Sequence, residues 1–138
     1  MIKEFCLAWE KNKDILKEYF RTHGQNEYNS YVMLVRLLFD LVINPEVDCK
    51  FDTDEIAILD NGDYRGVRIF ILHRDTYNHC ITDYVYTRAY YGSCCCCDVL
   101  QSIYWYNCDA LPTDVQVDSY MTLCLHLLQK CVYMIDPE

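Results

Sequence analysis

The sequence predicts a single α+β domain over residues 1–138: two N-terminal helices, a three-stranded antiparallel sheet, then a short and a long C-terminal helix packed on the sheet. Two changes of hydrophobic period carry this prediction. Apolar residues recur with a helical period up to residue 42, alternate along much of 54–91, and return to a helical period after residue 98. A chain of 138 residues is long enough to bury a core without covalent crosslinks.

The N-terminal helices are predicted over residues 2–22 and about 27–42. Asn12 interrupts the apolar stripe of the first helix, at a position where another apolar residue is expected. His23-Gly24 predicts the end of that helix, because glycine readily adopts the left-handed conformation that follows a helix. Asn44-Pro45 predicts the end of the second helix, because proline lacks the N–H that a helix interior needs.

The Asn61-Gly62 pair predicts a two-residue hairpin turn between strands over 54–60 and 63–73, because both residues tolerate a positive φ. That turn would pair Ile58 with Arg65. A third strand over about 82–91 is predicted as an antiparallel neighbour of the second, since the connection between them is short. One face of the hairpin would then be apolar, and it would carry Ile56, Ile58, Val67, Ile69 and Ile71.

The C-terminal part predicts a short helix over 98–106 and a long helix over about 114–135. Thr113 and Gln116 have the spacing of a capping box at the start of the long helix. His126 lies about 200° around that helix from Cys124, so it is predicted to point away from the core. The core stripe of the long helix is predicted to comprise Val117, Met121, Cys124, Leu128, Cys131 and Ile135.

The charge of the chain is acidic, with 21 Asp and Glu against 12 Lys and Arg, which gives a net charge of −9. This balance argues against direct binding to nucleic acid and favours a partner with a basic surface. Residues 44–63 hold a run of acidic side chains, which is either a solvated loop or a phosphate-like face for a nucleic-acid-binding protein. The carboxylates predicted to contact such a partner are Glu46, Asp48, Asp52, Asp54 and Glu55.

The location predicted for the protein is a reducing cytosol, without membrane contact. The sequence contains no apolar run of about 18 residues and no signal peptide. In such a compartment the ten cysteines indicate buried thiols and a metal site rather than a disulfide framework. No phosphate-binding, dinucleotide-binding, metalloprotease or serine-hydrolase motif is present, so the protein is expected not to be an enzyme.

Four adjacent cysteines, Cys94 to Cys97, lie where the third strand gives way to the short helix. Cys94 and Cys97 have the C-x-x-C spacing that lets two thiolates reach one metal ion or each other. Three interpretations remain open: a zinc site, a redox or nucleophilic thiol, and cysteines that only pack. Zinc would need further ligands, and the candidates are Asp63, His126, Asp60, Asp98 and Cys124. His73, His79 and Cys80 are predicted at the opposite end of the sheet, too far away to contribute.

A motif around this loop resembles a known family. The segment Tyr91-Gly92-Ser93-Cys94-x-x-Cys97-Asp98-x-Leu100-Gln101 is similar to the Y-G-S-C-S-G-C-D-x-L-Q pattern of small phage and prophage proteins of Gram-positive bacteria. Asp63-Tyr64-x-Gly66 and Met121-Thr122-Leu123-x-Leu125-His126 extend the resemblance over roughly residues 55–132. Cys95 and Cys96 replace Ser and Gly of the pattern, which implies that Cys94 and Cys97 are the functional pair.

The resemblance implies more than the residues alone. Small acidic phage proteins of this size include Cas9-directed (type II-A) anti-CRISPR proteins, some of which carry a metal. It therefore implies a non-enzymatic, zinc-stabilised inhibitor that binds a host defence nuclease of the Cas9 type and blocks its handling of nucleic acid. His126 lies in the matching stretch, so the implied zinc ligands are Cys94, Cys97, His126 and Asp63. A thiol enzyme using Cys94 or Cys97, or a phage regulatory protein with another partner, is the alternative.

Overall fold

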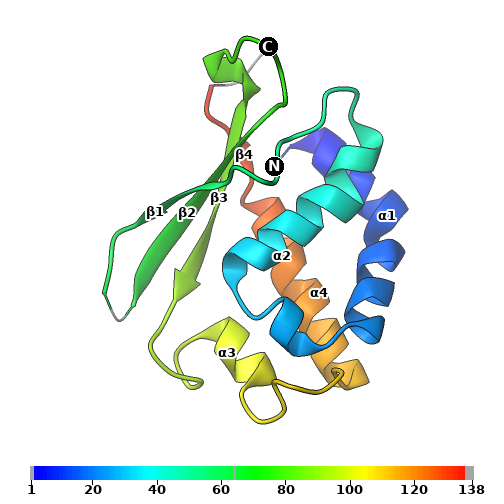
Figure 1. The fold of residues 1–138 in the computed structure, drawn as a ribbon, viewed down its shortest axis with the longest axis vertical. Coiled ribbons are helices and arrows are strands. Elements are labelled where there is room, and N and C mark those ends of the chain that lie inside the picture. Colours follow the sequence, from blue (N-terminus) through cyan, green and yellow to red (C-terminus); the bar gives the residue numbers. More distant parts are fainter. Residues whose placement is uncertain (1, 64, 136–138) are drawn as a thin grey trace.

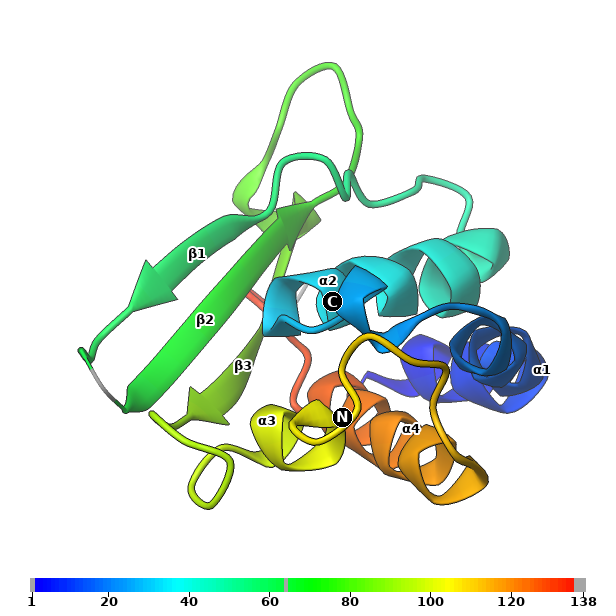
Figure 2. The same ribbon diagram turned by 60° about the horizontal axis from the view of Figure 1, so that its bottom comes forward.

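The computed structural model describes residues 2–63 and 65–135 and has the α+β architecture that the sequence predicts. One face of an antiparallel sheet packs against helices α2 (Tyr31–Leu37) and α4 (Asp114–Gln129). Helix α1 (Lys3–Thr22) covers these two helices on the side away from the sheet (Figure 1). The sheet has four strands in the order β1-β2-β3-β4, one more than predicted. Figure 2 shows the helical layer on one side of the sheet only.

The N-terminal helices agree with the sequence in type and differ in their bounds. Helix α1 spans Lys3–Thr22, and a 3₁₀ turn, Gln25–Glu27, follows it. Helix α2 spans Tyr31–Leu37 and continues as a π-helical segment, Leu38–Ile43, before a 3₁₀ turn at Asn44–Glu46. The second helix starts later than predicted because residues 25–28 form that first turn, in which Tyr28 is fully buried among aromatic rings.

Asn12 lies at a position where the sequence pattern expects an apolar residue, and its buried side chain links two helices by hydrogen bonds. Its side chain is buried, and its amide donates to the carbonyl of Val42 and to the carboxylate of Glu46, each at 3.0 Å. Val42 lies in the last turn of its helical segment, where backbone carbonyls lack a partner within the helix. The break in the apolar stripe thus marks a hydrogen bond that joins α1 to the end of the second helix.

The predicted hairpin register is wrong. Strands β1, Ala57–Asp60, and β2, Gly66–His73, pair Ile58 with Phe70 instead of Arg65, so that a five-residue loop replaces the two-residue turn. The Asn61 side chain holds this loop: its carbonyl oxygen accepts from the backbone N–H of Val67 at 2.8 Å. Asn61 therefore acts through its side chain here, a role that the Asn-Gly signal does not distinguish from a tight turn.

The shifted register changes the faces of the hairpin, because side chains alternate along a strand. Phe70 and Leu72 of β2 face the helices and are buried, with Val85, Thr87 and Ala89 of strand β3, Tyr84–Tyr91. The predicted apolar face is therefore divided between the two sides. Ile58 lies on the side of Phe70, whereas Val67, Ile69 and Ile71 lie on the outer side, where they are half-buried.

The C-terminal part contains the short helix α3, Val99–Tyr104, and the long helix α4, Asp114–Gln129. The capping box between Thr113 and Gln116 is present as predicted. The helix ends earlier than predicted, because the chain turns at Lys130 and adds strand β4, Val132–Tyr133, to β3. Ile135 is consequently half exposed and is not a core residue, in contrast to the prediction, while Cys124 and Cys131 are buried as predicted.

Replacing Asn12 with leucine tests whether Asn12 stabilises the contact between the helices or merely interrupts the apolar stripe of α1. Although the apolar pattern favours leucine at this position, we expect Asn12→Leu to lower the free energy of unfolding by about 1–3 kcal/mol, since the Val42 carbonyl would lose its partner. Urea denaturation followed by circular dichroism measures the change. Asp14→Leu, at an exposed position of α1, is the matched control and should change stability little. An Asn12→Leu variant as stable as the wild type would contradict this role.

Candidate functional site

The cysteine loop, defined as residues 92–98, joins the end of β3 to the start of α3. Its turn is closed by backbone N–H groups of Cys97 and Asp98, which donate to the carbonyl of Cys94 at 3.2 and 2.9 Å. This turn brings the sulfur atoms of Cys94 and Cys97 to 3.0 Å from each other. Gly92 packs so closely under it that a Cβ atom there would lie 2.7 Å from the Cys97 sulfur. The C-x-x-C spacing therefore does bring the two thiols together.

Asp98 fixes the loop from beneath. Its side chain is buried, with an exposed fraction of 5% for the residue. One carboxylate oxygen accepts from the backbone N–H of Gly92 at 2.9 Å, and the other accepts from that of Gln101 at 3.0 Å and from the Tyr31 hydroxyl at 3.1 Å. Asp98 is thus the N-cap of α3, and both of its oxygens accept structural hydrogen bonds. Among the described residues it forms no metal-ligand group with Cys94 and Cys97.

The thiols of the chain differ in their electrostatic surroundings. The hydrogen bond with the Cys94 thiol, followed by the bond from the Cys94 backbone N–H, lowers the pKa of the exposed Cys97 thiol. Burial has the opposite effect on the core thiols: it raises the pKa of Cys131 to about 12 and that of Cys124 further still. Cys97 therefore has more thiolate character than the core cysteines at neutral pH.

The predicted zinc ligands do not come together in one group. A structural zinc site needs about four ligands. Within residues 2–63 and 65–135, no third Cys, His, Asp or Glu places a ligand atom within 4.8 Å of both sulfurs of Cys94 and Cys97. Asp63 is exposed in the β1–β2 loop, and His126 is exposed on α4. The described residues thus supply two zinc ligands, half of a tetrahedral set, and zinc binding stays a prediction.

Two further candidate zinc ligands, Asp60 and Cys124, have other roles in the structure. Asp60 accepts hydrogen bonds from the Tyr91 hydroxyl, the Gly62 N–H and the Arg68 guanidinium, and the Tyr91 bond is the largest cause of its lowered pKa. This contact does place the β1–β2 loop beside the end of β3, as the sequence predicts. Cys124 is fully buried in the core and has no route to the cysteine loop.

The acidic loop, defined as residues 46–55, is held rigidly at several points. The buried Asn44 side chain makes two hydrogen bonds to the backbone of Phe51, at 2.9 and 3.0 Å. The Arg36 guanidinium donates to the carbonyl of Thr53 at 3.1 Å, and the backbone N–H of Asp52 donates to the carbonyl of His73 at 2.8 Å. Both the helical layer and the sheet therefore fix the course of this loop.

A group of three potential metal ligands lies at the sheet end of the acidic loop, and sequence reasoning missed it. Asp52, Glu55 and His73 place their ligand atoms within 4.8 Å of one another. His73 is at the opposite end of the sheet from the cysteines, as predicted. The missing signal was the β-bridge between Phe51 and Arg74, which brings the acidic loop against the end of β2. The Nδ1–H of the His73 ring donates to the Arg74 carbonyl at 3.1 Å, while Nε2 lies 3.6 Å from the Glu55 carboxylate.

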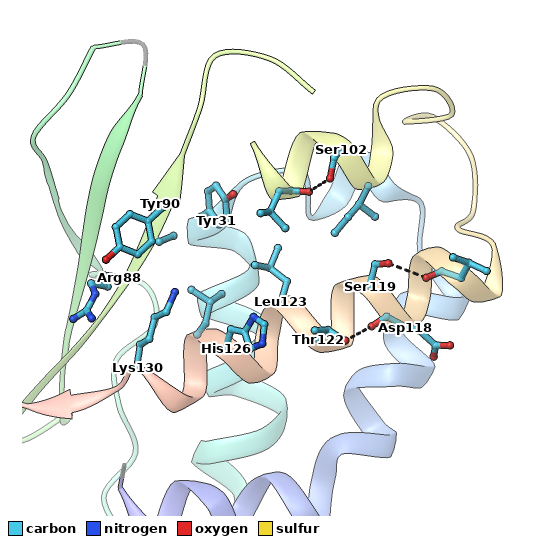
Figure 3. A pocket seen from close by; sticks show the side chains of 15 residues that line it. Tyr31, Arg88, Tyr90, Ser102, Asp118, Ser119, Thr122, Leu123, His126 and Lys130 are labelled. Carbon is cyan, nitrogen blue, oxygen red and sulfur yellow. Dashed lines mark hydrogen bonds between the residues drawn. The ribbon is translucent and has the colours of Figure 1, made fainter. Parts of the chain in front are cut away.

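His126 lies not at the cysteines but in a groove of about 540 Å³. The groove runs between α3, α4 and the end of β3 (Figure 3). Its apolar lining includes Ala89, Ile103, Leu123 and Leu127, which are buried. The volume is in the range of small-molecule sites.

The chain matches no protein-family model, no curated protein and no solved structure. The resemblance to phage proteins therefore depends on the quoted motif alone. In the part of the chain that the structure describes, no helix combines the length and the hydrophobicity needed to cross a membrane.

Removing the Asp98 carboxylate tests its position as the support of the cysteine loop. We expect Asp98→Ala to lower the free energy of unfolding by about 2–4 kcal/mol, since three donors would lose their acceptor. Chemical denaturation measures this change. Asp109→Ala, an exposed carboxylate in the loop after α3, is the control and should be close to neutral. Equal stability of the two variants would show that Asp98 has no such role.

Proposed function

We propose that this protein is a non-enzymatic binding protein that docks on a basic surface of a nucleic-acid-handling protein through its acidic loop. The observation that carries this proposal is a loop, fixed by hydrogen bonds, whose exposed carboxylates have no described lysine or arginine partner. Asp48, Asp54 and Glu55 are exposed, and within residues 2–63 and 65–135 none of them has a Lys or Arg partner within 4.0 Å. A surface that is already ordered loses little conformational entropy on binding.

The five predicted contact residues divide into two groups. Glu46 is committed to the fold, because Asn12 and Lys11 both bind its carboxylate, and the Asn12 bond is the largest cause of its lowered pKa. Asp52 is half-buried and caps the N–H of Asp54 at 2.9 Å. The proposed contacts are therefore Asp48, Asp54 and Glu55, with Asp52 and Glu46 shaping the loop.

The partner that we propose is a Cas9-type nuclease in the cytosol of a bacterial host. Such a nuclease holds its guide and target in positively charged channels. An acidic loop that occupies part of a channel would compete with the phosphate backbone for the same cations. The net charge of −9 would steer the encounter and keep the protein itself from binding nucleic acid.

Neutralising the three exposed carboxylates tests this proposal. We expect the variant Asp48→Asn, Asp54→Asn, Glu55→Gln to bind a Cas9–guide complex roughly 10- to 100-fold more weakly, and with less sensitivity to salt. Biolayer interferometry at two ionic strengths measures the binding. A gel-shift assay measures whether the protein displaces target DNA.

The control removes the same charge from another surface. Glu10→Gln, Asp14→Asn, Glu18→Gln changes three exposed residues of α1 and should leave affinity within a factor of about three, apart from weaker long-range steering. Equal losses in both variants would refute the acidic loop as the contact. Absence of any binding to Cas9 at micromolar concentration would refute the proposed partner.

A second function, thiol–disulfide exchange, is favoured by one observation: two exposed thiols lie 3.0 Å apart, and one of them has a lowered pKa. The Cys97 thiolate would attack a disulfide and release one thiol. Cys94 would then displace the second thiol and form the Cys94–Cys97 disulfide, so that two hydrogens pass to the substrate disulfide.

Native alkylation tests the reactivity of Cys97. At pH 7 we expect iodoacetamide to modify Cys97 at least about threefold faster than Cys96, because a lower pKa leaves more reactive thiolate. Cys96 is the control, since it is exposed in the same loop. Mass spectrometry after limited labelling measures the rates.

Two further results separate the alternatives. With oxidised glutathione, the wild type should lose two hydrogens, whereas Cys94→Ser should stop at the mixed disulfide. Equal alkylation rates at Cys96 and Cys97 would refute this function. About one zinc per chain by elemental analysis, absent from both Cys94→Ser and Cys97→Ser, would favour a metal site instead.

A further inference from the structure

The groove beside α4 has a charge pattern opposite to that of the chain as a whole. Figure 3 shows Arg88, Tyr90 and Lys130 together at one end, with His126 next to them, and Asp118 at the other end. Among residues 2–63 and 65–135, Asp118 is the only carboxylate in the lining of the groove, and its oxygen lies 3.5 Å from the ammonium of Lys17. Within the same residues, no carboxylate lines the end that holds Arg88 and Lys130.

The two cations are not used in ion pairs. Across residues 2–63 and 65–135, no carboxylate lies within 4.0 Å of the charged nitrogens of Arg88 or Lys130. The Lys130 ammonium instead lies 5.1 Å from the centre of the Tyr90 ring, a cation–π contact that holds it over the groove. Arg88 is exposed. Arg88 pairs with Ile69 on the outer side of the sheet, yet it lines the same cavity as Lys130. Two cations without an ion-pair partner among the described residues therefore border one groove of an acidic chain.

The serine and threonine hydroxyls of the groove are already used. Ser102, Ser119 and Thr122 each donate to a backbone carbonyl of their own helix, at 2.5, 3.0 and 3.0 Å. The donors at the basic end are therefore Arg88 and Lys130, with the Tyr90 hydroxyl and the His126 ring beside them. Such a set recognises an anionic head group.

The rest of the groove is apolar. Ile103, Leu123 and Leu127 lie on its buried side, and Val99 and Val115 are 57% and 75% exposed on its rim. Apolar side chains exposed beside a cavity gain from contact with an apolar ligand, because removing apolar surface from water is favourable. The remainder of a matching ligand is consequently hydrocarbon or aromatic.

We propose that this groove binds a small amphipathic anion, whose head group contacts Arg88 and Lys130 and whose apolar body lies against α3 and α4. The C-terminal end of α4 contributes about half a negative charge nearby. Two full positive charges exceed it. The groove is lined by residues of α2, α3, α4 and β3 and by Lys130, none of which belongs to the acidic loop, so the site is separate from the proposed partner contact.

Three probes that share an eight-carbon chain test the proposal: octyl sulfate, octylammonium and 1-octanol, each below its micellar concentration. Isothermal titration calorimetry gives affinities, and ¹⁵N–¹H correlation spectra show where each probe binds. A protein of net charge −9 attracts the cation by its overall field. Tighter binding of the anion would therefore have to come from the groove.

We expect octyl sulfate to bind with a dissociation constant below about 1 mM, at least tenfold tighter than octylammonium or octanol. The amide signals of Leu123, His126 and Lys130 should shift. Arg88→Ala with Lys130→Ala should weaken octyl sulfate binding by about tenfold for each cation removed. Lys13→Ala with Arg21→Ala, which removes two cations from the exposed side of α1, should leave it within a factor of about two.

The proposal is overturned if octylammonium binds as tightly as octyl sulfate, or if the shifted signals lie away from the residues that line the groove. Equal affinity of the Arg88/Lys130 double variant and the wild type would also overturn it. Octyl sulfate that fails to bind at millimolar concentration would exclude an amphipathic anion of this size.

Discussion

The buried carboxylate of Asp98 is the interaction on which the cysteine loop depends. It joins three elements of the chain. It contacts the end of β3 through Gly92, the start of α3 through Gln101, and α2 through the Tyr31 hydroxyl. A buried carboxylate is stable only when its oxygens accept several hydrogen bonds. Since Asp98 meets that condition, the thiols beside it occupy fixed positions on an otherwise exposed loop.

The acidic loop is also fixed by a buried polar side chain, which here is the neutral amide of Asn44. Asn44 is buried and pairs with both polar groups of the Phe51 backbone, so one amide replaces a short piece of sheet. In both places a buried polar residue at the start of a helical element fixes an exposed segment beside it. The two segments then differ in chemistry: one presents soft sulfur atoms, and the other presents hard carboxylate oxygens.

Local features of the chain and the antiparallel neighbours β2 and β3 could be predicted from sequence, whereas the strand register and most side-chain contacts between distant segments could not. The helix of residues 3–22, the capping box at Thr113 and the approach of Cys94 to Cys97 all depend on residues within four positions of one another. The hairpin register failed because the Asn61 side chain supports a longer loop, which a pattern of alternating residues cannot reveal. The group around His73 was missed because a single bridge at Phe51 creates it. Arg88 and Lys130 are 42 positions apart in the sequence and line the same groove. No local pattern around either residue predicts that they lie in one lining.

The π-helical segment Leu38–Ile43 sets the rotational phase at which the chain leaves the helical layer. An α-helix turns by about 100° per residue and a π-helical turn holds an extra residue, so the loss of a single residue from this segment would change the angle at which the chain leaves it. Asn44 would then face away from Phe51, and the acidic loop would lose its attachment to the sheet. The direction in which this protein presents its negative charge is therefore determined by a count of residues inside a helix, and a deletion there would re-aim that charge without altering a single carboxylate.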